Sequence, residues 1–139
     1  MAYNTGSVLF VDDDEVIAAL LPALLELEGY EVTVSTSSIN ALGTFRRDPQ
    51  HFDLVITDYV MPEMTGDVLI GHLRRLRPDI PIILCSGFYK DLDMGHIQVL
   101  EVDAFLPKPV TFEDLSQAIQ DALHQRAEQD TSTNPTPDA

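Results

Sequence analysis

Val8-Leu9-Phe10-Val11-Asp12-Asp13, at residues 8–13, is a short apolar run that ends on two carboxylates. An unbroken apolar run of this length is typical of a strand buried on both faces, as the strands of a parallel sheet are. A second such run, Leu54-Val55-Ile56-Thr57 at residues 54–57, is followed directly by Asp58. The two stretches predict two strands of one parallel sheet, each with an acidic side chain at its carboxyl end.

Two further runs have the same form. Residues 80–85 are followed by Ser86-Gly87, and a brief strand at 104–106 leads into Pro107-Lys108-Pro109. The carboxyl ends of parallel strands meet at one rim of an open sheet, and ligands bind at that rim. We therefore expect three aspartates, one serine and one lysine to converge there: Asp12, Asp13, Asp58, Ser86 and Lys108.

The segments between the runs favour helices. A fifth strand is expected at Glu31–Ser35, and the apolar spacing predicts helices over 15–28, from 37 or 38 to about 48, over 66–77, over 90–100 and from 111 onward. Asp14 and Thr111 are expected to cap the first and last of these helices, and Pro22 to kink the first. Five strands alternating with five helices predict an α/β fold, a three-layer α/β/α sandwich around a parallel sheet. Residues 1–6 are assigned to an extension, 7–126 to the domain and 127–139 to a disordered tail.

Charge and composition restrict the function. The chain has 139 residues, with 23 acidic against 8 basic side chains. That excess repels phosphate-rich partners, so nucleic-acid binding by this chain alone is not expected. No membrane segment or signal peptide is visible, and the single cysteine, Cys85, excludes an internal disulfide and favours a reducing cytoplasm. The acidity has two interpretations, which are solubility and a cation site.

The run Asp12-Asp13-Asp14-Glu15 offers more carboxylates than helix capping needs. Like charges packed this densely are unfavourable unless a cation offsets them. Oxygen-only ligands suit a hard divalent cation such as Mg²⁺. Capping accounts for one carboxylate and leaves a cation site as the interpretation of the others.

Asp58 ends a strand but does not directly precede a helix, so capping explains it poorly. A carboxylate can act as a nucleophile toward phosphorus and form an acyl phosphate. That reaction depends mostly on positioning and charge neutralisation, which Lys108 and the hydroxyl of Ser86 could supply. An ordinary surface lysine is the competing interpretation of Lys108.

The chain resembles the receiver domain of two-component signalling, the aspartyl-phosphate module of response regulators. The resemblance runs from about Ser7 to Arg126 and rests on four motifs in order, which are Val11-Asp12-Asp13, the segment 58–66 (Asp-Tyr-Val-Met-Pro-Glu-Met-Thr-Gly), Ser86-Gly87 and Lys108-Pro109. It implies a flavodoxin-like (CheY-like) sheet with strand order 2-1-3-4-5.

The resemblance also implies residue roles. Asp58 would be the phosphoacceptor, and Asp12, Asp13, Asp58 and the Val60 backbone carbonyl would hold Mg²⁺ or Mn²⁺. Ser86 and Lys108 would bind the phosphoryl group. Phe105 would be the aromatic that changes rotamer with Ser86, although a plain core aromatic is the simpler interpretation of that residue.

A histidine kinase or histidine phosphotransfer domain would then be the phosphodonor. The surface that responds would be built by the helix at 90–100, the strand at 104–106 and the helix from 111, and a homodimer could form through it. Catalysis would be limited to the domain's own phosphorylation and dephosphorylation. The resemblance fits either a single-domain regulator or the receiver of a hybrid sensor histidine kinase.

Two other classes stay open. One is a receiver kept as an unphosphorylated docking or dimerisation module. The other is a haloacid-dehalogenase-type Mg²⁺-dependent phosphohydrolase. That family has a second aspartate two residues after the nucleophile, where this chain has Val60.

Val60 and Phe88 depart from the commoner receiver pattern, because both are apolar where polar residues are frequent. Both are expected to flank the path of an attacking water. We hypothesise that the aspartyl phosphate of this chain is long-lived.

Overall fold

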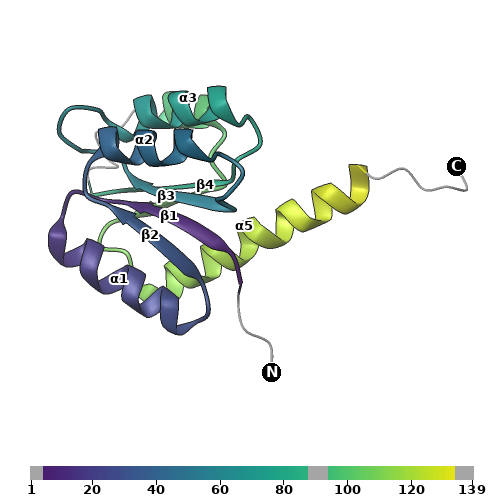
Figure 1. The fold of residues 1–139 in the computed structure, drawn as a ribbon, viewed down its shortest axis with the longest axis horizontal. Coiled ribbons are helices and arrows are strands. Elements are labelled where there is room, and N and C mark those ends of the chain that lie inside the picture. The colour runs from purple at the N-terminus through teal and green to yellow at the C-terminus, as the bar shows by residue number, and fades with distance from the viewer. Residues whose placement is uncertain (1–4, 88–93, 134–139) are drawn as a thin grey trace, which may run out of the picture.

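A computed structural model of the protein describes residues 5–87 and 94–133. Strands and helices alternate along these residues and form a five-stranded sheet in the order β2-β1-β3-β4-β5 (Figure 1). The elements are β1 (Ser7–Val11), α1 (Glu15–Leu27), β2 (Glu31–Ser35), α2 (Ser38–Arg47), β3 (Leu54–Asp58), α3 (Gly66–Leu76), β4 (Ile82–Ser86), α4 (Met94–Leu100), β5 (Ala104–Pro107) and α5 (Phe112–Thr133). Every strand pair is parallel. The predicted fold class and strand order are confirmed.

The three central strands are buried along their whole length. Every residue of β1, β3 and β4 is buried, whereas β2 and β5 at the edges are more exposed. This burial matches the continuous apolar runs of the sequence. In the register, Val11 pairs with Thr57 and Asp58 pairs with Cys85, so β1, β3 and β4 end together. The residues that follow these strands are thereby brought to one rim.

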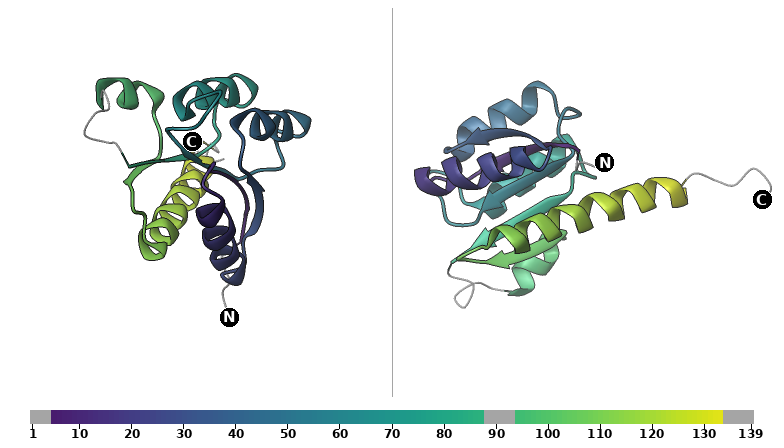
Figure 2. Two further views of the ribbon diagram at one scale, coloured as in Figure 1. Left: turned by 90° about the vertical axis from the view of Figure 1, so that its left-hand side faces the viewer. Right: turned by 90° about the horizontal axis from the view of Figure 1, so that it is seen from below.

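Helices cover both faces of the sheet (Figures 1 and 2), and the sheet separates two apolar cores. α2, α3 and α4 pack on one face through side chains that include Phe45, Leu73 and Ile97. α1 and α5 pack on the other face, where Leu25 and Ile119 are buried. The molecule is the predicted three-layer sandwich.

The predicted helix caps are present. Asp14 Oδ1 accepts hydrogen bonds from the backbone N–H groups of Val16 and Ile17, which begins α1. Thr111 Oγ1 accepts from the N–H of Asp114 and begins α5. Capping therefore explains Asp14 but not Asp12 or Asp13.

Two helices differ in extent from the sequence-based expectation. α5 continues to Thr133 and so includes residues that the sequence assigned to a tail. Good helix formers at 127–129 (Ala-Glu-Gln) let the helix propagate beyond its apolar face. α4 is described from Met94, and the first part of the helix expected at 90–100 lies outside the described residues. Pro22 is buried inside α1, which is a single helix from Glu15 to Leu27.

Candidate functional site

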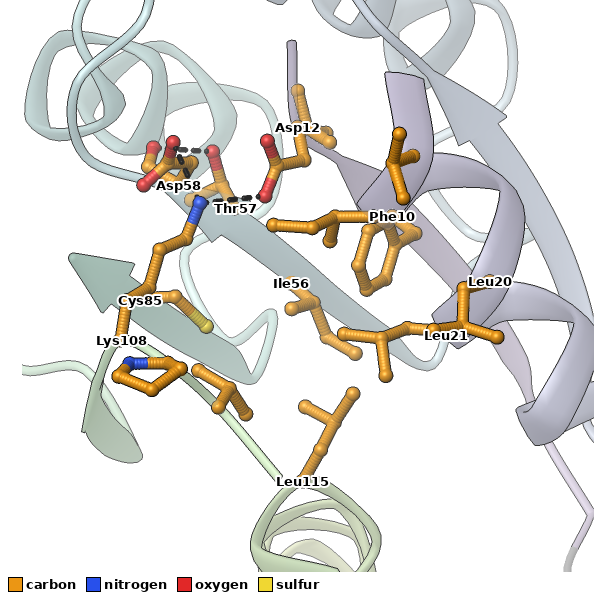
Figure 3. A pocket seen from close by; sticks show the side chains of 15 residues that line it. Phe10, Asp12, Leu20, Leu21, Ile56, Thr57, Asp58, Cys85, Lys108 and Leu115 are labelled. Atoms are coloured by element: carbon orange, nitrogen blue, oxygen red, sulfur yellow. Dashed lines mark hydrogen bonds and ion pairs between the residues drawn. The ribbon is translucent and has the colours of Figure 1, made fainter. Parts of the chain in front are cut away.

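Polar side chains gather at the rim where β1, β3, β4 and β5 end. Asp12 follows β1, Asp58 is the last residue of β3, Ser86 is the last of β4, and Lys108 follows β5. Asp12, Asp58 and Ser86 are all buried despite their polarity. Figure 3 shows Asp12 and Asp58 turned toward the amine of Lys108. The predicted convergence of Asp12, Asp58 and Lys108 is therefore present in the structure.

The amine of Lys108 lies between two carboxylates. Its Nζ is 2.9 Å from Asp12 Oδ2 and 3.1 Å from Asp58 Oδ2 (Figure 3). The interpretation of Lys108 as an ordinary surface lysine is wrong, because the side chain reaches into the rim and is mostly buried. The Lys108 N–H donates to the carbonyl of Ser86 at 2.8 Å, which fixes the residue to the end of β4.

Three carboxylates lie close enough to share a cation. One oxygen from each of Asp12, Asp13 and Asp58 lies within 4.8 Å of the other two. Asp13 is exposed, whereas the other two are buried, so the cluster opens to solvent on one side. An all-oxygen set with one or two carboxylates and room for water is what Mg²⁺ prefers. The residues present fit a divalent cation.

Local backbone groups orient the two buried carboxylates. Asp12 Oδ1 accepts the N–H of Asp14 at 2.9 Å, and Asp58 Oδ1 accepts the N–H of Tyr59 at 2.9 Å. The buried hydroxyl of Thr57 donates to the Asp58 carbonyl at 3.0 Å. Each carboxylate thus has one oxygen held by backbone and the other by Lys108. Preorganised side chains of this kind suit a reaction that depends on positioning.

The segment after Asp58 folds back onto it. The Gly66 N–H donates to the carbonyl of Tyr59 at 2.7 Å, which sets the start of α3 against the end of β3. A Cβ on Gly66 would lie 2.2 Å from the Asp58 carbonyl oxygen and 2.9 Å from Tyr59 Cα. Only glycine fits this close approach. Gly66, the last residue of the motif at 58–66, is therefore explained by its close approach to the end of β3.

Burial and neighbouring charges shift the ionisation of the site. Burial raises the pKa of Asp58 and the charge of Asp12 adds to this, while Lys108 opposes both. Burial alone would lower the pKa of Lys108, but its contacts with Asp12 and Asp58 raise it. Lys108 is therefore a fixed positive charge at neutral pH, in a site where the negative charges repel each other.

Cys85 lies beside this site without taking part in it. Burial raises the pKa of its thiol to about 12, which keeps the sulfur protonated and unreactive. The free thiol of Cys85 is buried.

The remaining predicted site residues have different surroundings. Phe105 is half-buried and packs against the core under α2, α3 and α4. Val60, two residues after Asp58, is 47% exposed, and its predicted role as a residue flanking the site stays a prediction. Phe88 lies outside the described residues, so its predicted place is not tested.

Sequence reasoning did not anticipate the polar link between α3 and α4. His96 Nε2 lies 2.8 Å from Asp67 Oδ2, and Arg74 donates to the carbonyls of Leu100 and Glu101 at 3.3 and 3.2 Å. A pair separated by this much sequence has no periodic signal, so only the three-dimensional structure reveals it.

Comparison with known proteins identifies the family. Residues 8–120 match the model of the response regulator receiver domain. The transcriptional regulatory protein GlrR of Escherichia coli is 35% identical over 127 residues, which are 91% of this chain and 28% of that protein. The sensor kinase CckA of Brucella abortus is 30% identical over 123 residues, which are 88% of this chain and 13% of the kinase. The chain thus spans less than a third of these two relatives.

Solved structures agree with this assignment. The crystal structure of a response regulator receiver domain protein from Clostridium thermocellum superposes with a TM-score of 0.81 at 32% identity, covering 88% of this chain and 98% of that one. The chain belongs to the response regulator receiver domain family and is a receiver domain of two-component signalling. No helix in the described part of the chain is both long and apolar enough to cross a membrane.

Proposed function

We propose that Asp58 accepts a phosphoryl group and that the domain acts as a phosphorylation-dependent switch. The observation that carries this proposal is the position of Lys108, whose amine lies within hydrogen-bond distance of both Asp12 and Asp58. Asp58 is a buried carboxylate that ends a strand, and it lies next to the positive charge of Lys108 and two further carboxylates. This arrangement is suited to phosphoryl transfer rather than to helix capping.

In the proposed step, an oxygen of Asp58 attacks the phosphorus of the donor. A phosphorus–oxygen bond forms and the bond from phosphorus to the donor's histidine nitrogen breaks, leaving the electron pair on the imidazole. Lys108 is placed to turn from the Asp58 carboxylate to a phosphoryl oxygen and neutralise its charge. Ser86 would donate its hydroxyl to another phosphoryl oxygen.

The acidic cluster would hold Mg²⁺ (or Mn²⁺) through Asp12, Asp13, Asp58 and the backbone carbonyl of Val60. When bound, the cation would supply charge neutralisation to the phosphoryl oxygens. The fit rests on the closeness of the three carboxylates and on their hard oxygen donors.

The proposed output is a change in the surface formed by α4, β5 and α5. Ser86 ends β4 and Phe105 lies in β5, which pairs with it. A shift of Ser86 toward the phosphoryl group would leave space that Phe105 can occupy, and a covalent charge would thereby bias one of two packings. A homodimer through this surface is part of the proposal.

The proposed phosphodonor is a histidine kinase or a histidine phosphotransfer domain in the cytoplasm. The relatives include both a transcriptional regulator and a sensor kinase, which supports a receiver of either a regulator or a hybrid kinase. Catalysis would be limited to the domain's own phosphorylation and dephosphorylation.

The decisive experiment is incubation with acetyl phosphate and Mg²⁺, followed by intact mass measurement. The proposal expects one added phosphoryl group in the wild type and none in Asp58→Asn or without the divalent cation. Unmodified protein under conditions in which the cation binds normally would instead favour the docking module.

A further inference from the structure

A cavity of about 180 Å³ lies between the sheet, α1 and α5, directly beneath the acidic rim (Figure 3). Apolar side chains form most of its wall, and Asp12, Asp58 and Lys108 close one end. The apolar part of the wall is contributed by β1, α1, β3, β4 and α5, through residues that include Phe10, Ile17, Leu21, Ile56, Cys85 and Leu115. Nothing in the proposed phosphoryl transfer uses this space.

The cavity opens to solvent past α1. Val16 and Leu20 line it and are 74% and 55% exposed, so they form the mouth of the cavity rather than its floor. Packed protein interiors contain few voids larger than a water molecule, because atoms lining a void lose their contacts. An accessible void of this size is a place where an occupant would gain contacts.

The chemistry of the wall defines the occupant. At the polar end, Lys108 is paired with both Asp12 and Asp58, so it is already neutralised. An anion would enter next to two carboxylates, in a chain of net charge −15. A water needs two to four polar partners, which the apolar wall does not provide. These observations favour a neutral, apolar molecule.

The volume of the cavity indicates the size of the group that it can enclose. Apolar cavities of about 150 Å³ bind benzene, and this cavity is of similar volume. We propose that the cavity between α1 and α5 is a binding site for a neutral, apolar molecule about the size of one aromatic ring.

The test is a titration of the full chain with toluene, in which binding is monitored through shifts of the amide resonances. The matched probe is benzoate, which keeps the ring and replaces the methyl group by a carboxylate. The proposal expects saturable shifts with toluene that are strongest in α1, β3 and α5. Benzoate should produce no saturable shift at the same concentrations.

Two variants locate the site. Leu20→Trp adds bulk at the mouth of the cavity, where the exposed position can accept a larger side chain. Ile17→Phe fills space from the half-buried wall. Each should weaken toluene binding at least about tenfold, equivalent to about 1.4 kcal/mol. Leu27→Trp is the matched control, since Leu27 is 81% exposed on the same helix and does not line the cavity. It should bind toluene as the wild type does.

Thermal unfolding of each variant without ligand confirms that it is folded. The proposal is overturned if toluene gives no saturable shifts, if benzoate binds as tightly, or if both filled variants bind like the wild type. Toluene binding is measured on unphosphorylated protein, and phosphorylation of Asp58 is measured in a separate assay. A failure of toluene binding therefore leaves the proposed phosphorylation of Asp58 standing, and a failure of phosphorylation leaves the proposed binding site standing.

Discussion

A Cβ on Gly66 would lie 2.2 Å from the carbonyl oxygen of Asp58, so the first residue of α3 and the last residue of β3 touch through bare backbone. This contact holds the loop that carries Val60 against the rim. It makes the glycine a structural requirement of the site, since any side chain would have to push α3 away from β3.

Gly66→Ala is therefore expected to destabilise the fold by about 1–3 kcal/mol, the usual cost of overpacking. Gly71→Ala is the matched control in the same helix, because a Cβ there would meet no atom within 4 Å. That control should stabilise by about 0.5–1 kcal/mol. Urea unfolding of both variants measures the difference, and equal stabilities would contradict the contact.

Lys108→Met tests the counter-charge. Removing the amine leaves Asp12 and Asp58 without their cationic partner, so a divalent cation should bind roughly tenfold more tightly. Phosphorylation by acetyl phosphate should nevertheless become inefficient, because no amine remains to neutralise the phosphoryl oxygen. Calorimetric titration with Mg²⁺ gives the affinity, and unchanged or weaker binding would argue against the ion pairs.

The link between α3 and α4 predicts a pH dependence. Burial alone would raise the pKa of Asp67, but hydrogen bonds from Thr65 and His96 lower it below its ordinary value of 3.8. The ionised form is thus favoured by folding. Its stabilising contribution is present above pH 3.8 and is lost as pH falls through the lowered pKa.

Asp67→Asn should accordingly cost about 0.5–1 kcal/mol at neutral pH, the usual range for a partly exposed pair at a helix N-terminus. Thermal unfolding of both proteins as a function of pH measures the gap. The gap should close toward acid pH, and a gap that stays constant below pH 3.8 would show that the carboxylate charge is not its cause.

Val60 predicts a slow loss of the phosphoryl group. An apolar, half-exposed side chain beside the rim offers no hydrogen bond to an attacking water. Val60→Asn should shorten the lifetime of the aspartyl phosphate several-fold, measured by the decay of the phosphorylated mass. A lifetime that is unchanged or longer in the variant would remove Val60 as a determinant.

The sequence predicted the sheet well because its evidence is local. The apolar runs before Asp12, Asp58 and Ser86 mark buried strands directly, and the rim follows from their parallel arrangement. The end of the last helix was not predicted, since α5 runs on to Thr133 through residues that have no apolar pattern.

Features that depend on distant contacts were not predictable. The sequence suggested Lys108 as a counter-charge but not its simultaneous contact with Asp12 and Asp58. The pairing of Asp67 with His96 joins two helices whose relative placement has no local code. The cavity between α1 and α5 depends on how side chains from several elements fail to fill a space, which no linear pattern records.

The central claim is that Asp58 is the nucleophile that receives the phosphoryl group. Hydride reduction of an aspartyl phosphate converts that residue to homoserine, so treatment of the phosphorylated protein with borohydride and peptide mass mapping locates the modified position. Homoserine at position 58, absent without phosphodonor, is the predicted result. Homoserine at another aspartate, or at none in protein that carries the phosphoryl mass, would contradict it.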